Sequence, residues 1–115
     1  MKKRVINYRT KKQKEVAAIV AIASKDRVKA SKDAKKLLKE GKETNNALYI
    51  GTANYILGLI EFRNGTRTNL LSYALKAVAM LNGSVDYEMV VRSHNLLGIA
   101  YSAMEEYQLA LSAYN

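Results

Sequence analysis

The chain has 115 residues, with 19 Lys and Arg, ten Asp and Glu and a formal net charge of +9. It contains no Cys, which excludes a disulfide framework and a cysteine-based metal site. It also contains no Pro, and its six Gly lie mostly between runs of helical periodicity, so we expect a single all-α domain.

The positive charge is concentrated in the N-terminal third. Residues 1–42 hold 15 of the 19 basic residues and four acidic ones, a net charge of +11, whereas residues 43–115 carry a net charge of −2. Such asymmetry is typical of proteins that bind nucleic acid or an anionic surface, although a solvated Lys-rich helix face gives the same pattern. We interpret residues 1–10 as a basic segment that precedes a helical domain of residues 11–115.

The first predicted helix covers residues 11–23, with Val16, Ile19 and Val20 on one stripe. Its apolar run, residues 16–23, is only eight residues long. A helix needs about 20 apolar residues to cross a bilayer, so we expect no membrane span and a cytoplasmic protein.

The second predicted helix runs from about Arg27 to Glu40 and packs back on the first. Ser24 or Asp26 can cap its N-terminus, and Gly41 is expected to end it. This gives a first hairpin of about residues 11–41.

A second hairpin is predicted for residues 44–82. Thr44 or Asn45 can cap its first helix, which ends at Asn64-Gly65, and its second helix runs from about Arg67 to Leu81. The inward stripe of that second helix consists of Leu70, Leu71, Ala74, Ala77, Val78 and Leu81.

The third predicted hairpin covers residues 86–115. Asp86 can cap its first helix, and a tight turn is expected near Glu105, where a sixth helix begins. The spacing within this stretch is Leu97-Gly98, then Tyr101, then Ala110 and Tyr114. A Gly in mid-helix costs about 1 kcal/mol relative to Ala, so Gly98 is expected to permit close approach of a neighbouring helix that presents Ala110.

This spacing resembles the tetratricopeptide repeat, a helix-turn-helix unit of about 34 residues. Leu57-Gly58 repeats Leu97-Gly98 at an offset of 40, which makes the pattern a divergent version with longer helices. The resemblance implies about six helices in antiparallel hairpins that stack as a short right-handed α-solenoid. Because the pattern is still running at Asn115, we expect the repeats to continue beyond it.

No catalytic or cofactor-binding pattern is recognisable, so we predict neither an enzyme nor a cofactor or metal site. The single histidine, His94, has no Cys or second His beside it and is interpreted as a core or groove-edge residue. Gly51 and Gly58 lie within a helix and lack the Gly-Lys-Ser or Gly-Lys-Thr of a phosphate-binding loop.

The resemblance instead implies a groove that binds a protein or peptide, lined by the first helix of each hairpin. Its mixture of aromatic, aliphatic, Arg and Asn side chains suits an apolar peptide with an acidic or amide anchor. The candidate residues are Thr52, Tyr55, Leu59, Phe62 and Arg63 from one helix and Arg92, Asn95, Ile99 and Ser102 from the next.

We therefore predict a protein-interaction module, by analogy a regulatory or sensory N-terminal domain of a bacterial signalling protein, for example ahead of a diguanylate cyclase. A homodimer through the face of the C-terminal helix is a further expectation. The alternative is a nucleic-acid-binding domain that acts through the basic N-terminal third.

Overall fold

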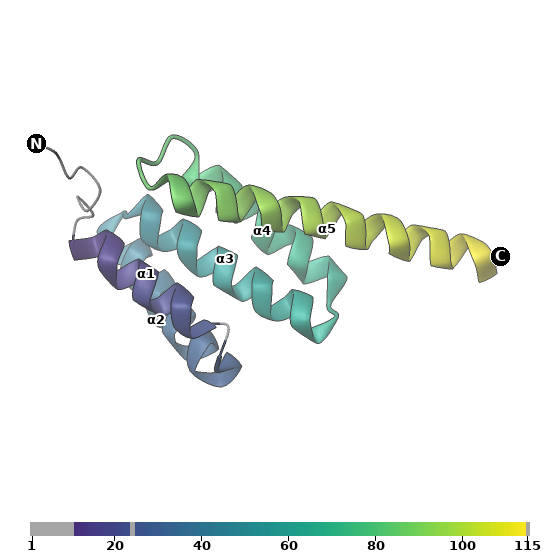
Figure 1. Cartoon of the computed structure of the whole chain (residues 1–115), viewed down its shortest axis with the longest axis horizontal. Coiled ribbons are helices and arrows are strands. Elements are labelled where there is room, and N and C mark those ends of the chain that lie inside the picture. The colour runs from purple at the N-terminus through teal and green to yellow at the C-terminus, as the bar shows by residue number, and fades with distance from the viewer. Residues whose placement is uncertain (1–10, 24, 115) are drawn as a thin grey trace, which may run out of the picture.

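The computed structural model of the chain describes residues 11–23 and 25–114, and the basic segment of residues 1–10 lies outside them. The described part is all-α, as predicted, and contains no strand (Figure 1). Its helices are α1 (Lys11–Ala23), α2 (Arg27–Thr44), α3 (Ala47–Asn64), α4 (Arg67–Leu81) and α5 (Tyr87–Tyr114).

Helix α3 is the centre of the fold, because it contacts each of the other four helices. Residues 51–58 form two continuous turns in which every residue is buried. Helices α1 and α5 lie against α3 without contacting each other, and α2 and α4 also lie apart, within the described residues. The arrangement leaves part of α3 uncovered between α1 and α5, and the candidate site lies there.

Helices α2 and α3 each begin at a polar N-cap residue whose side chain accepts a backbone hydrogen bond. The Asp26 carboxylate accepts the backbone N–H of Lys29 at 3.1 Å, and the Asn46 side chain accepts that of Tyr49 at 3.2 Å. Asp26 therefore caps α2 as predicted, while Ser24 lies outside the described residues. The cap of α3 is Asn46, one residue beyond the predicted alternatives, Thr44 and Asn45.

The prediction that Gly41 ends the second helix is wrong, because α2 continues to Thr44. The left-handed residue at its end is Asn45, with φ 53°, and Asn is the residue besides Gly that adopts this conformation most readily. Gly41 is buried within the helix instead. A Cβ there would lie 2.9 Å from side-chain atoms of both Tyr49 and Ile50, so its lack of a side chain lets α3 approach α2.

The predicted turn near Glu105 does not form, so the described chain has five helices where six were expected. Helix α5 continues without a break through this position, and residues 101–114 contain neither Gly nor Pro to stop it. The last part of α5 projects past the rest of the bundle (Figure 1, yellow). Despite this length, no described helix combines the length and apolarity that a membrane crossing requires.

The close approach predicted at Gly98 is not formed either, since a Cβ there would have no neighbour within 4 Å. The side chains of Ala110 and Tyr114, which complete the repeat pattern, lie outside the described part. At Gly58, the equivalent position 40 residues earlier, a Cβ would lie 2.8 Å from Leu96 of α5 and 3.1 Å from Tyr73 of α4. Gly58 thus has the packing role that was expected of Gly98.

Candidate functional site

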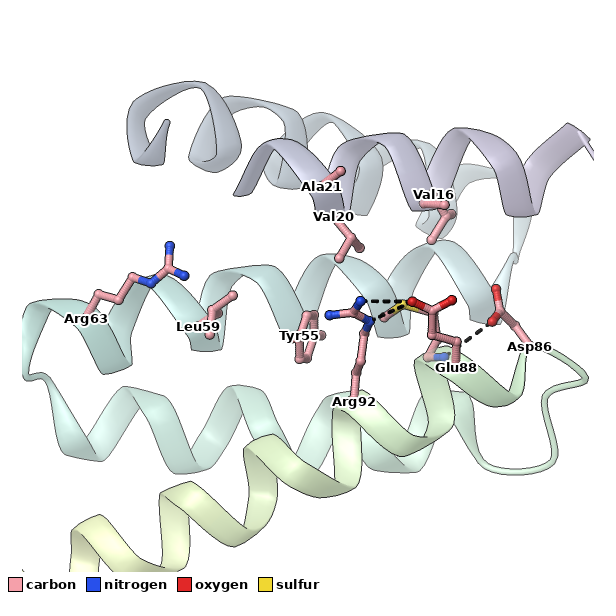
Figure 2. Close-up of a pocket in the computed structure, with 11 residues that line it drawn as sticks. Val16, Val20, Ala21, Tyr55, Leu59, Arg63, Asp86, Glu88 and Arg92 are labelled. Carbon is pink, nitrogen blue, oxygen red and sulfur yellow. Dashed lines mark hydrogen bonds and ion pairs between the residues drawn. The ribbon is translucent and has the colours of Figure 1, made fainter. Parts of the chain in front are cut away.

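A channel of about 410 Å³ runs along α3 between α1 and α5 (Figure 2). We call it the α3 channel. It exists because α1 and α5 both pack on α3 but do not close over it. Its lining combines an apolar wall from α1, a floor from α3 and a polar wall from α5. The lining residues are Val16, Ala17, Val20, Ala21, Tyr55, Leu59, Arg63, Asp86, Glu88, Met89 and Arg92.

The floor of the α3 channel consists of Tyr55, Leu59 and Arg63, which are spaced four residues apart and therefore share one face of α3. Tyr55 is buried, Leu59 is half-buried and Arg63 is exposed. Figure 2 shows the Arg63 side chain at one end of the channel, with Tyr55 nearer the other end. The floor thus changes from apolar and enclosed to charged and open along its length.

The polar wall contains an ion pair between Arg92 and Glu88, one turn apart on α5. Nη2 of Arg92 lies 2.8 Å and Nε 3.2 Å from the same Glu88 oxygen, and both side chains are about half exposed. Hydrogen bonding to Glu88, and then to Tyr55, raises the pKa of Arg92 above its ordinary value. Arg92 is therefore a permanent cation whose position is fixed from two helices.

Asp86 lies at the enclosed end of the channel and is itself buried. Its carboxylate accepts the backbone N–H of Met89 at 3.3 Å, and its own N–H donates to Oγ of Ser84 at 3.1 Å. Asp86 is thus the N-cap that sequence predicted, and its negative charge stabilises the start of α5.

The structure distributes the nine predicted groove residues over three environments. Tyr55, Leu59, Arg63 and Arg92 line the α3 channel. A second, more open hollow of about 660 Å³ lies between α3 and α5, and we call it the Gly98 groove. It is lined by four of the predicted residues, Phe62, Asn95, Ile99 and Ser102, together with Gly98, Ala103 and Glu106.

Thr52 belongs to neither hollow. Its side chain is fully buried within α3, and its hydroxyl has no hydrogen-bond partner among the residues that the structure describes. The helical spacing that placed Thr52 on the same face as Tyr55 is correct, but the neighbouring helices cover that end of the face. Thr52 is therefore part of the core.

The apolar wall contributed by α1 was missed by sequence reasoning, as were Glu88 and Met89. Val16 and Val20 were recognised only as the inward stripe of the first helix. Nothing local in the sequence shows that this stripe faces α3 across a gap, since Val16 and Val20 lie 39 positions before Tyr55 and Leu59, respectively, two channel residues of α3. The four-residue spacing between Glu88 and Arg92 was the one available signal for the ion pair.

Among the described residues, exposed basic side chains are most numerous on α2, and Lys11 and Lys14 of α1 are exposed as well. The side chains of Lys32, Lys35, Lys36, Lys39 and Lys42 are all exposed. Lys29 forms an ion pair with Asp33 at 3.7 Å, one turn along the helix. The buried stripe of α2, Ala30, Ala34, Leu37 and Gly41, lies on the other side of the helix.

The α3 channel is lined by equal numbers of basic and acidic side chains. Its charged groups, two Arg and two acidic residues, balance one another, and Asp86 and Glu88 already accept hydrogen bonds from the protein. His94 is exposed on α5 and does not belong to the core. Within the described residues, no three His, Cys, Asp or Glu side chains are grouped so that they could hold a metal ion.

Comparison of the chain with known protein families, curated proteins and solved structures finds no match to any of them.

Proposed function

We propose that the protein is a cytoplasmic, tetratricopeptide-like interaction module and that the α3 channel binds a peptide segment of a partner protein. The observation that carries the proposal is an open channel between an apolar wall on α1 and a charged wall that contains Glu88 and Arg92. Its floor is α3, the helix that contacts all four others. A rigid floor holds the binding groups in place before the ligand arrives, which lowers the entropy lost on binding.

The lining suggests the character of the peptide. Apolar side chains of the ligand would pack against Val20, Ala21 and Leu59, which contribute the hydrophobic contact. An acidic or amide side chain of the ligand would accept hydrogen bonds from the guanidinium groups of Arg63 and Arg92, which present planar arrays of donors. A short peptide with apolar residues next to an acidic or amide residue fits both requirements.

The test is selection from a phage-displayed library of random twelve-residue peptides on the immobilised full chain. The variant Ala21→Glu places a carboxylate at an exposed position on the apolar wall, so the fold should be kept while peptide enrichment falls at least tenfold. The matched control, Ala79→Glu, makes the same change at an exposed position on α4 outside the channel. Equal enrichment by all three proteins would reject the channel as the binding site.

The proposed solenoid arrangement and signalling role rest on analogy with proteins of similar fold. Helices α1, α3 and α5 form a row in which successive members touch, and α2 and α4 each pack beside two members of that row. This arrangement supports a short solenoid of helical hairpins, as proposed from the repeat pattern. Such modules serve as regulatory or sensory input to a longer signalling protein, for example a bacterial nucleotide cyclase, and we extend that role to this chain.

The exposed lysines of α2 favour a second candidate function, binding to nucleic acid through phosphate contacts. Replacing Lys32, Lys35 and Lys39 together by Gln should then reduce binding to double-stranded DNA and flatten its dependence on salt. Titrating a fluorescent duplex at several salt concentrations measures both effects. Binding that is absent, or that is the same for both proteins, would exclude this function.

A further inference from the structure

The Gly98 groove is an unfilled packing site on α5. Four glycines lie within the described helices, and for three of them, Gly41, Gly51 and Gly58, a neighbouring side chain lies within 2.9 Å of where a Cβ would stand. At Gly98 no atom of the described residues outside its own helix backbone and chain neighbours lies within 4 Å of where a Cβ would stand. Since a helical Gly costs about 1 kcal/mol relative to Ala, the first three are explained by close packing and Gly98 is not.

The surroundings of Gly98 are apolar and open. Phe62 at the end of α3 is 44% exposed and Ile99 is 38% exposed, and both line the same hollow. Both are large apolar side chains that remain partly exposed to solvent. They lie beside Gly98, whose lack of a side chain would allow another backbone to approach closely. The groove therefore has the shape and chemistry of a helix-packing surface without its helix.

The face of α5 that lines the groove is complementary to itself. In an antiparallel pair of α5 helices centred between residues 100 and 101, Gly98 of one copy lies opposite Ala103 of the other, and Ile99 lies opposite Ser102. Asn95 lies opposite Glu106, so an amide donor meets a carboxylate acceptor on each side of the two-fold axis. The two Glu106 residues remain apart, because each lies about eight Å along the helix from the axis.

The projecting end of α5 strengthens the choice of a second copy as the occupant. This end carries the exposed apolar side chains Tyr101, Tyr107, Leu109 and Leu111, together with the acidic pair Glu105 and Glu106 and no basic residue. In the antiparallel pair, the end of each α5 lies along the first half of the other α5. Of these side chains, Leu109 shares the face of α5 that carries Gly98 and Ser102, so the contact that fills the Gly98 groove brings Leu109 beside the second molecule.

We propose that two copies of the chain associate through the Gly98 groove, with their α5 helices antiparallel and Asn95 of each copy paired with Glu106 of the other. The Gly98 groove shares no lining residue with the α3 channel. One helix pair is at the small end of specific interfaces, so the dissociation constant should be about 10 µM.

Sedimentation velocity of the full chain, from low micromolar to millimolar concentration, tests the proposal. The wild type should shift from monomer to dimer across this range. Gly98→Leu should keep the protein monomeric, because a bulky side chain blocks close approach, while its Cβ has open space among the described residues of the monomer. The matched control Gln108→Leu adds the same side chain at an exposed position on another face of α5 and should dimerise as the wild type does.

The pairing of Asn95 with Glu106 is tested by exchanging the two residues. Asn95→Glu places carboxylates opposite each other and should weaken the dimer about tenfold. Adding Glu106→Asn to the same chain restores an amide opposite a carboxylate and should recover wild-type dimerisation. Circular dichroism confirms that each variant is folded. A wild type that stays monomeric, a dimer that tolerates Gly98→Leu, or a double variant without recovery would each overturn the proposal.

Discussion

Tyr49 links the first and third helices through one hydrogen bond. Its hydroxyl donates to Oε2 of Glu15 at 3.1 Å, and its ring is buried. Burial, and then the hydrogen bond and the negative charge of Glu15, raise the pKa of Tyr49 above its ordinary value of 10.0. The folded state therefore holds the phenol proton more tightly than the unfolded state does.

The consequence is a pH dependence at the alkaline end. Because the folded-state pKa is raised, the stability that Tyr49 contributes is complete below pH 10.0 and falls as the pH rises towards the folded-state pKa. Tyr49→Phe should cost about 1 kcal/mol at neutral pH and should lose less stability than the wild type above pH 10.0. Urea unfolding at neutral and alkaline pH measures the difference, and parallel losses in both proteins would contradict the assignment.

Thr52 offers a second test at the level of one side chain. Within the described part of the chain its buried hydroxyl has no hydrogen-bond partner, so the fold bears the cost of removing it from water. Thr52→Val has nearly the same shape and should leave stability unchanged or raise it by about 1 kcal/mol, as thermal unfolding would show. A clear loss of stability would mean that the hydroxyl has a partner.

Helix packing in this protein is organised by glycines, and two of them give a matched comparison. A Cβ at Gly51 would lie 2.5 Å from Cγ of Leu81, a fully buried residue of α4, so Gly51→Ala should destabilise the protein by about 1–3 kcal/mol. Gly98→Ala meets nothing and should instead stabilise the dilute monomer by up to about 1 kcal/mol. Denaturant unfolding at low protein concentration should give opposite signs. Equal effects would mean that neither helix contact is as described.

Individual helices were largely predictable from the sequence where local signals agreed. The bounds of α4 follow from Gly65 before it and Gly83 after it, and the expected inward stripe is buried or half-buried throughout. Asp86 caps α5 because a short carboxylate side chain there can reach the N–H of Met89.

The predictions of helix ends were wrong where one residue type is found both at helix ends and within helices. Gly41 was interpreted as a helix stop, but it serves tertiary packing, and the stop falls on Asn45. Glu105 and Glu106 suit either the first turn of a helix or its exposed middle, so the pair could not show whether α5 turns or continues.

At the scale of the whole molecule, the candidate site depends on contacts distant in the sequence. Periodicity alone grouped Tyr55, Leu59 and Arg63 on one face, and that grouping holds. It could not separate the α3 channel from the Gly98 groove, because the division is made by where α1 and α5 rest on α3. The tertiary arrangement thus turns one predicted groove into two surfaces, to which we assign different partners.

The central claim is that a peptide ligand lies in the α3 channel, and amide chemical-shift mapping tests it most directly. A peptide enriched by the phage selection would be titrated into ¹⁵N-labelled protein while the shifts of all backbone amides are followed. The account predicts that the largest changes cluster around Val20, Leu59 and Arg92, on three different helices that meet only at the channel. Changes confined to the lysine face of α2 or to the Gly98 groove would contradict it.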